Sequence, residues 1–322
     1  MPSSIQREIA YSVEHFYPKH PAHPIAPLTA ESHGYFRQES IQATHLVIAG
    51  DNTGSIDRLL DGRTNFSMDA HPAMLIEAND QGKDLHIIGS YRNGLPFSIA
   101  ALPDTIKGSM DLKGRRLCTN RRLGAGERIT RTLYNKLGID PDRDLDVVVI
   151  ENEGMPEKIA ALKEGQADFV VYHHNGPQGR VVKELIRREE LVEVIDLSQL
   201  FPHYVIRSMA TTGRMLRGQP EIVKDFIKGV MRAHRFMKEE DPTGSDSVNV
   251  LKRALNVDSL AGSGVENGIP KSWPLEPRGI IASVEGLKVH MEELKAAGRI
   301  DPGFSVERVV HNGLAEEALS EL

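Results

Sequence analysis

Residues 110–126 read MDLKGRRLCTNRRLGAG, and the order of structure that they predict decides the fold class. The short apolar run at 116–119 favours a strand. A loop with two arginines and two glycines follows it, and a helical pattern then runs from about residue 127 to 137. A strand that leads through a glycine-containing loop into a helix is the repeating element of α/β folds.

The same alternation of short strands and longer helices extends in both directions from this stretch. Strands are predicted at 9–13, 44–48, 65–68, 85–90, 97–102, 147–150 and 169–172. Helices are predicted at 28–36, 55–60, 72–79, 156–162, 221–237, 247–255 and 281–297. Strands that alternate with helices favour mostly parallel sheets with helical crossovers, so the predicted class is α/β.

Length, charge and composition narrow the possible functions. At roughly 100–200 residues per domain, the 322 residues predict about two domains. The 39 basic and 45 acidic side chains leave a net charge of −6, which disfavours a nucleic-acid partner. No apolar run approaches the roughly 18–20 residues that span a bilayer, so no membrane insertion is expected. The single cysteine, Cys118, excludes an intrachain disulfide and is expected in the core.

The first residues bear on location. A signal peptide has a basic start, about 7–15 apolar residues and a small-residue cleavage site, and residues 1–8 do not show this pattern. They run directly into the first predicted strand. The chain as written is therefore expected in the cytoplasm, and in the periplasm if a leader was removed.

Four short motifs occur in a characteristic order. They are Gly34–Phe36, Leu112–Arg116, Leu137–Pro141 and Ala160–Asp168. This ordered set resembles the nitrate/sulfonate/taurine-type solute-binding family, which includes the thiamine-pyrimidine-synthesis-like proteins. The resemblance covers roughly residues 9–240. It is informative about the fold and much less so about the activity.

The resemblance implies a type II periplasmic-binding-protein fold with two α/β lobes, each built on a mixed, mostly parallel sheet. Lobe one would comprise residues 1–96 and 204–322, and lobe two residues 97–203. Two crossing segments, near 93–97 and 203–207, would join them. A small organic anion would bind in the cleft between the lobes, where strand ends and helix N-termini converge. Closure about the crossing segments would exclude water from it.

The loop after the first strand holds the first candidate residues, Tyr17, His20 and His23. In this fold the loop faces the cleft, and histidine can donate, accept or transfer a proton near neutral pH. His20 is a candidate catalytic residue, and Tyr17 and His23 are candidate substrate contacts. The alternative is a solvated surface loop. No spacing here matches a zinc motif, so no metal and no cofactor are predicted.

His71 follows the strand at 65–68 and precedes a helix that begins at Pro72. Proline is favoured at the first helical position, where the free N–H groups of the helix point outward. In the resembled fold this position faces the cleft, and His71 is a candidate catalytic residue. The alternative is a packed, hydrogen-bonded histidine or one that caps the helix.

The loop after the strand at 116–119 is a candidate anion site. Thr119, Asn120, Arg121 and Gly126 are the predicted substrate contacts. A guanidinium can form two parallel bonds with a carboxylate, sulfonate or phosphate, and a helix N-terminus carries partial positive charge. The sequence lacks the lysine and hydroxyl residue of a P-loop and the third glycine of a dinucleotide-binding fingerprint. The alternative is a pair of solvated arginines.

The last candidates, His173, His174 and Asn175, follow the apolar strand at 169–172. In the resembled proteins this position contributes ligand contacts from lobe two. His173 is a candidate catalytic residue, and His174 and Asn175 are candidate substrate contacts. Adjacent side chains point in different directions, so at most one histidine is expected to face the ligand. The alternative is a hydrogen-bonded turn.

Two functions fit this reading. The favoured one is a cytoplasmic lyase of the decarboxylase type acting on a small, aromatic carboxylate. Arg121 would hold the carboxylate, and a histidine would protonate the ring carbon as carbon dioxide leaves. Relatives on this fold include 4,5-dihydroxyphthalate decarboxylase and an aryl-sulfinate desulfinase, and a cytoplasmic protein cannot serve an external transporter.

The alternative is the substrate-binding protein of an ABC transporter for a small organic anion, of the sulfonate, nitrate, taurine or aromatic carboxylate type. Such a protein would work with a permease, and this partner is expected only if the chain is secreted. A homo-oligomer is compatible with either function. The sequence does not name the ligand.

Overall fold

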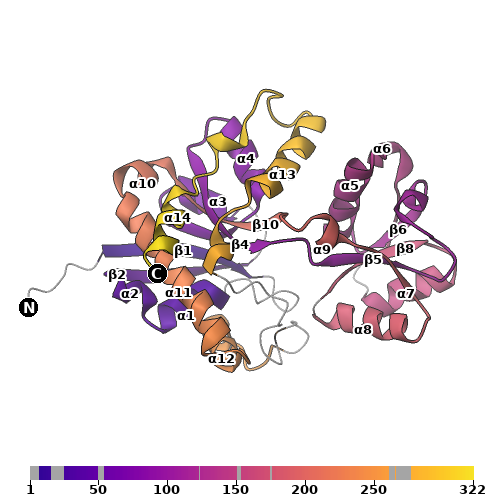
Figure 1. The fold of residues 1–322 in the computed structure, drawn as a ribbon, viewed down its shortest axis with the longest axis horizontal. Coiled ribbons are helices and arrows are strands. Elements are labelled where there is room, and N and C mark those ends of the chain that lie inside the picture. Colours follow the sequence, from indigo (N-terminus) through magenta and orange to yellow (C-terminus); the bar gives the residue numbers. More distant parts are fainter. Residues whose placement is uncertain are drawn as a thin grey trace, which may run out of the picture. The chain divides into compact units, whose positions relative to one another are not determined.

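The computed structural model describes residues 7–15, 25–49, 54–122, 124–150, 154–174, 176–260, 265 and 277–322. The chain divides into two compact units. Unit 1 comprises Met1–Gly94 and His203–Leu322, and unit 2 comprises Leu95–Pro202. Each unit is built around its own five-stranded sheet (Figure 1).

The sheet of unit 1 has the strand order β2-β1-β3-β10-β4. Its strands are β1 (Arg7–His15), β2 (Ile41–Ala49), β3 (Phe66–Ala70), β4 (Leu85–Asn93) and β10 (Val205–Thr212). The pairs β1–β2 and β1–β3 are parallel, whereas β10 is antiparallel to both β3 and β4. Four strands therefore share one direction and β10 opposes them.

Helices cover both faces of this sheet. They are α1 (Ile25–Ser32), α2 (Tyr35–Gln38), α3 (Gly54–Leu60), α4 (Pro72–Asp80), α10 (Gly213–Gly218), α11 (Pro220–Glu239), α12 (Ser245–Leu255), α13 (Val284–Ala296) and α14 (Gly313–Ser320), with the 3-10 turns η2 (Pro277–Ile280) and η3 (Val306–Arg308). One apolar core lies between the sheet and α1, α2, α11, α12 and α14. A second core lies under α3, α4 and α13.

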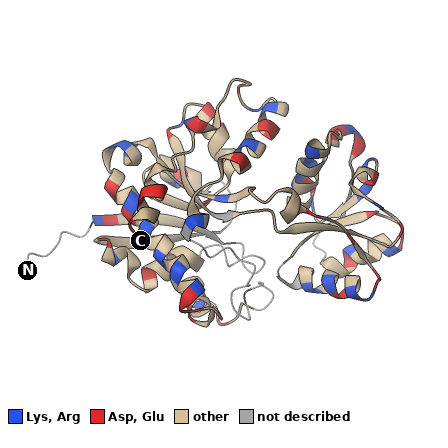
Figure 2. Ribbon diagram, in the orientation of Figure 1, with Lys and Arg blue, Asp and Glu red and all other residues tan. Residues whose placement is uncertain are grey.

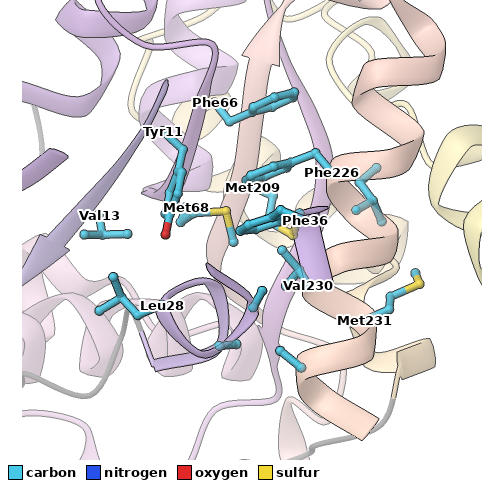
Figure 3. Packing of buried hydrophobic residues seen from close by; sticks show 14 of the residues in the cluster. Tyr11, Val13, Leu28, Phe36, Phe66, Met68, Met209, Phe226, Val230 and Met231 are labelled. Atoms are coloured by element: carbon cyan, nitrogen blue, oxygen red, sulfur yellow. The ribbon is translucent and has the colours of Figure 1, made fainter. Parts of the chain in front are cut away.

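Stacked aromatic rings form the centre of the first core (Figure 3). The ring of Phe226 on α11 lies parallel to Phe66 of β3 at 4.1 Å and to Phe36 of α2 at 4.9 Å between centroids. Gly229, one turn after Phe226, permits this packing. A Cβ at residue 229 would lie 2.4 Å from Cδ1 of Phe36, closer than two carbon atoms can approach.

The sheet of unit 2 has the order β7-β6-β8-β5-β9. Its elements are β5 (Phe97–Ala101), η1 (Ser109–Leu112), β6 (Arg116–Thr119), α5 (Ala125–Leu137), α6 (Pro141–Asp144), β7 (Asp146–Val149), α7 (Met155–Lys163), β8 (Phe169–His173), α8 (Gly176–Arg187), β9 (Val192–Asp196) and α9 (Leu197–Leu200). β5 runs antiparallel to β8 and β9 and the other pairs are parallel. The predicted α/β class with mixed, mostly parallel sheets is confirmed.

Local features of the sequence account for several of these elements. Pro72 and Pro156 stand in the first turns of α4 and α7, where the missing N–H of proline costs nothing. Gly138 ends α5 with φ 70°, a left-handed conformation that glycine adopts without strain. Cys118 is buried in β6, as expected, and burial raises the pKa of its thiol.

Charged residues of both signs are interspersed on the helices of each unit (Figure 2). In unit 1, the carboxylate of Glu39 lies 3.0 Å from both Lys228 and Arg232 of α11. In unit 2, Asp168 receives two bonds from the guanidinium of Arg116, at 3.0 and 3.1 Å, which link the start of β8 to the start of β6. These ion pairs join segments that are distant in sequence within each unit.

Candidate functional site

The edge of unit 2 where β6 ends carries the predicted anion site. β6 ends at Thr119, and Gly124 is the N-cap of α5. Glycine supplies no side-chain oxygen, so the N-cap residue itself makes no side-chain cap hydrogen bond. The first N–H groups of a helix have no partner within it, and here they are presented with the partial positive charge of a helix N-terminus.

Close packing brings Thr119 and Arg121 to this helix start. A Cβ at Gly126 would lie 3.3 Å from the hydroxyl oxygen of Thr119, so the first turn of α5 lies directly against the end of β6. A Cβ at Gly124 would lie 3.0 Å from Cγ of Arg121. The exposed Arg121 side chain therefore begins beside the N-cap.

Glu127, a buried acid in the first turn of α5, shares this end of the helix. Its carboxylate lies 3.1 Å from Nε of Arg131 and 4.0 Å from Arg122. Two guanidinium groups thus face the Glu127 charge, and Arg122 is directed to an internal partner. Of the two adjacent arginines, Arg121 is the one without an ion pair among the described contacts.

His173 lies on the same face of the sheet. The position of a Cβ at Gly126 is 3.9 Å from Cβ of Val171, so α5 packs against the Val171 face of β8. Side chains alternate along a strand, which places His173 on that face too. Its ring meets Phe97 edge-on, with centroids 4.8 Å apart.

His174 points into a different network. Its Nε2 atom lies 2.7 Å from the hydroxyl oxygen of Ser98 and 3.5 Å from Oδ1 of Asp196. Burial lowers the pKa of His174, although the Asp196 carboxylate acts in the opposite direction. In a Ser-His-Asp triad the serine and the acid contact opposite ring nitrogens, whereas both contact Nε2 here. The arrangement ties the end of β8 to β5 and β9 and is not a nucleophilic triad.

The corresponding strand end in unit 1 carries His71. It is the N-cap of α4, and its side chain makes no cap hydrogen bond. The imidazole is half-buried and meets the ring of His290 edge-on, with centroids 5.5 Å apart. Arg207 of β10, also half-buried, lies near this edge, and its guanidinium is 3.4 Å from the carbonyl oxygen of Asp69.

The structure thus gathers Thr119, Arg121, Gly126 and His173 about the start of α5, and separates His174 from them. Asn120 is half-buried in the same loop. Tyr17, His20, His23 and Asn175 lie outside the described residues. Among the residues that are described, no cluster of three or more His, Cys, Asp or Glu side chains is arranged to hold a metal ion.

Sequence reasoning missed Ser98, Asp196, Arg207 and His290. A lone serine inside the apolar strand 97–101 was the available signal for Ser98. No sequence signal indicated Asp196, Arg207 or His290, because their partners are distant in sequence. Within the described chain, none of the helices has the length and apolar character needed to cross a membrane.

Comparisons with known proteins place these features in context. The model of the family described as NMT1/THI5 like matches residues 23–243. The sulfonate-binding protein SsuA from Methylobacillus flagellatus KT is 13% identical with a TM-score of 0.66, over 99% of this chain and 95% of that chain. The periplasmic aliphatic sulphonate-binding protein SsuA from Escherichia coli is 11% identical with a TM-score of 0.64, over 95% and 92%.

The desulfurization enzyme DSZB is also similar, 15% identical with a TM-score of 0.57, over 98% of this chain and 99% of that chain. No curated protein sequence is a significant match. The resemblance to solute-binding proteins and the type II periplasmic-binding fold are confirmed.

The prediction of a decarboxylase-type lyase is wrong, and so is the assignment of the chain as a carbon–carbon lyase. The family match and the sulfonate-binding structures support the solute-binding alternative instead. His174, expected as a substrate contact, lies instead 2.7 Å from the Ser98 hydroxyl and 3.5 Å from the Asp196 carboxylate. An aromatic carboxylate as substrate is likewise unsupported, because the similar binding proteins bind sulfonates. A cytoplasmic location is unsupported as well, because these similar proteins are periplasmic.

Proposed function

Because the chain belongs to the NMT1/THI5-like family, whose model matches residues 23–243, we propose that it is the periplasmic solute-binding component of an ABC importer. We propose a small organic anion, with a sulfonate as the first candidate, as its ligand. The similar proteins from Methylobacillus flagellatus and Escherichia coli are sulfonate-binding proteins, which supports this choice. Its partner would be the importer's permease.

The start of α5 carries the proposal. An uncapped helix N-terminus, the Thr119 hydroxyl and the Arg121 guanidinium supply several hydrogen-bond donors and net positive potential in one place. A sulfonate spreads one negative charge over three oxygens and can accept from several donors at once. A hydrogen bond to a charged group contributes roughly 1.5–3 kcal/mol, and a favourable charge at a helix end roughly 0.3–1 kcal/mol.

A binding protein needs no side chain that transfers a proton to its ligand. In such a protein a histidine can act as a ligand contact alone. His173 offers an N–H and a ring face beside the same helix start, next to Phe97. We propose His173 as a contact for the organic part or an oxygen of the ligand. We also propose His71, at a strand end of unit 1, as a ligand contact. Because the lyase prediction is wrong, the catalytic roles expected of His71 and His173 are withdrawn.

A binding panel tests the proposal with the full chain. Methanesulfonate, taurine, nitrate and benzoate are titrated calorimetrically, with uncharged methanesulfonamide as the matched neutral control. At least one anion is expected to bind at one site with Kd of about 1 μM, equivalent to about −8 kcal/mol. Methanesulfonamide is expected to bind at least tenfold more weakly. No binding by any anion, or chemical conversion of a bound anion, would contradict the proposal.

Two adjacent arginines provide an internal control. Arg121→Ala is expected to weaken binding of the tightest anion at least tenfold, about 1.4 kcal/mol. Arg122→Ala removes a charge of the same sign one residue away, but its guanidinium faces Glu127, so affinity is expected to stay within threefold. Equal losses in the two variants would show that only overall charge matters and would remove Arg121 from the site.

A further inference from the structure

A buried histidine on α13 lies behind the strand ends of unit 1. His290 is 1% exposed. Its Nε2 atom is 2.8 Å from the carbonyl oxygen of Val205, the first residue of β10. A carbonyl only accepts hydrogen bonds, so Nε2 carries the proton and donates, and Nδ1 is the unprotonated nitrogen of the neutral ring. Nδ1 lies 3.5 Å from the hydroxyl oxygen of Tyr204.

These contacts hold the segment where the chain re-enters unit 1. Unit 1 resumes at His203, and Val205 pairs with Asn93 at the end of β4. The carbonyl oxygen of Tyr204 accepts a hydrogen bond of 2.7 Å from the amide of Gly94, the last residue of unit 1 before the chain leaves it. His290 is therefore hydrogen-bonded to residues 203–205, where the chain re-enters unit 1. This segment is in turn hydrogen-bonded to Gly94, where the chain leaves unit 1.

Gly286, one turn before His290 on the same face of α13, shows how closely the helix approaches this segment. A Cβ at residue 286 would lie 1.8 Å from the carbonyl oxygen of His203 and 3.0 Å from the amide nitrogen of Val205. Only glycine permits this distance. Two positions four residues apart, Gly286 and His290, thus fit α13 onto residues 203–205.

The His290 ring also meets the ring of His71. The two rings are nearly perpendicular, at 79°, with centroids 5.5 Å apart. An edge-to-face contact fixes the orientation of both rings. His290 therefore contacts both the proposed ligand residue His71 and the re-entry segment. An apolar side chain of similar size could fill the same volume, but it would offer no N–H to the Val205 carbonyl.

We infer that His290 is a positioning residue, which holds His71 and residues 203–205 in the arrangement that ligand binding requires. The part that concerns His71 rests on the proposed function. The part that concerns the re-entry segment does not, since it follows from the hydrogen bond to Val205 and the close approach of Gly286.

Three variants separate positioning from simple core filling. His290→Leu removes the N–H donor, and His290→Gln retains an amide donor on a side chain of similar reach. His234→Leu is the matched control, because His234 is also a buried histidine of unit 1 but lies on α11. Amide hydrogen exchange at Gly94, measured without ligand, reports on the bond to Tyr204. Calorimetry with methanesulfonate, or the tightest anion of the panel, reports on binding.

His290→Leu is expected to raise exchange at Gly94 at least tenfold and to weaken anion binding at least fivefold. His290→Gln should stay within threefold of the wild type in both, and His234→Leu should change neither. Unchanged exchange in His290→Leu, equal change in His234→Leu, or changed exchange with unchanged affinity would overturn the inference. If no anion binds the wild type, the proposed function fails, while the exchange result still decides the positioning of residues 203–205.

A measurement on the wild type covers the case in which His290→Leu does not fold. Nitrogen-15 chemical shifts of the imidazole at pH 7 are expected to show a proton on Nε2 of His290 and none on Nδ1. A proton on Nδ1 with none on Nε2 would mean that the bond to Val205 is not made and would overturn the inference.

Discussion

Replacing His290 with glutamine should reduce the amount by which the free energy of unfolding of unit 1 falls at acid pH. Burial lowers the pKa of His290 from 6.5 to about 4, although the hydrogen bond to the Val205 carbonyl acts in the opposite direction. Between these values the unfolded chain binds a proton that the folded chain does not, so the free energy of unfolding falls as the pH falls. At about 1.36 kcal/mol per unit, the 2.5-unit difference amounts to about 3 kcal/mol below pH 4 and about 2 kcal/mol at pH 5.

Urea unfolding at pH 8 and pH 5 tests this reasoning. Far-ultraviolet circular dichroism of the full chain follows the loss of its helices. Other titrating groups affect wild type and His290→Gln equally, so the quantity compared is the difference between the two proteins. The stability of the wild type relative to the variant should fall by about 2 kcal/mol from pH 8 to pH 5. A difference that stays constant over this range would refute a buried, neutral His290.

Two further predictions concern a packing contact in unit 1 and an ion pair in unit 2. Gly229→Ala should lower the free energy of unfolding by about 1–3 kcal/mol, because its Cβ would strike the ring of Phe36. Gly218→Ala, where nothing lies within 4 Å, is the control and should be neutral in the same denaturation experiment. Asp168→Asn should destabilise unit 2 by about 2 kcal/mol, because Arg116 loses a bidentate charged partner, and an unchanged urea midpoint would contradict this.

Local patterns predicted much of the fold. The strand at 116–119 has the bounds of β6, and the helix expected from Pro72 is α4. Proline, glycine and short apolar runs act over a few residues, so they can be read in one sequence. The first residue of a helix near the N-terminus was predicted less well. The helix expected from Leu28 begins three residues earlier, at Ile25, and Pro27 lies in its first turn, where proline is tolerated.

Long-range pairing was not accessible in the same way. β10 inserts antiparallel between β3 and β4, so Ser208 pairs with both Ala70 and Ser90. No periodicity within 205–212 indicates its neighbours or direction. α8 was also missed, because it begins with Gly176–Pro177, residues typical of a turn. For the same reason the sequence could not show that His174 turns to Ser98 or that His71 meets His290.

The functional error had a different origin. The residues about α5 were recognised as suited to an anion, and this chemistry serves a decarboxylase and a binding protein equally. The choice of a lyase rested on the expected location and not on a group in the site. Proton transfer was assigned to histidines because of their ordinary pKa, which a sequence cannot correct for burial; in this structure burial lowers the pKa of other histidines, His174 and His290.

A crystal structure of the full chain with methanesulfonate tests the central claim most directly. The proposed function predicts sulfonate oxygens within about 3 Å of the first amides of α5 and of the Arg121 guanidinium. Sulfonate bound elsewhere, with the start of α5 left to solvent and Arg121 directed away, would contradict it.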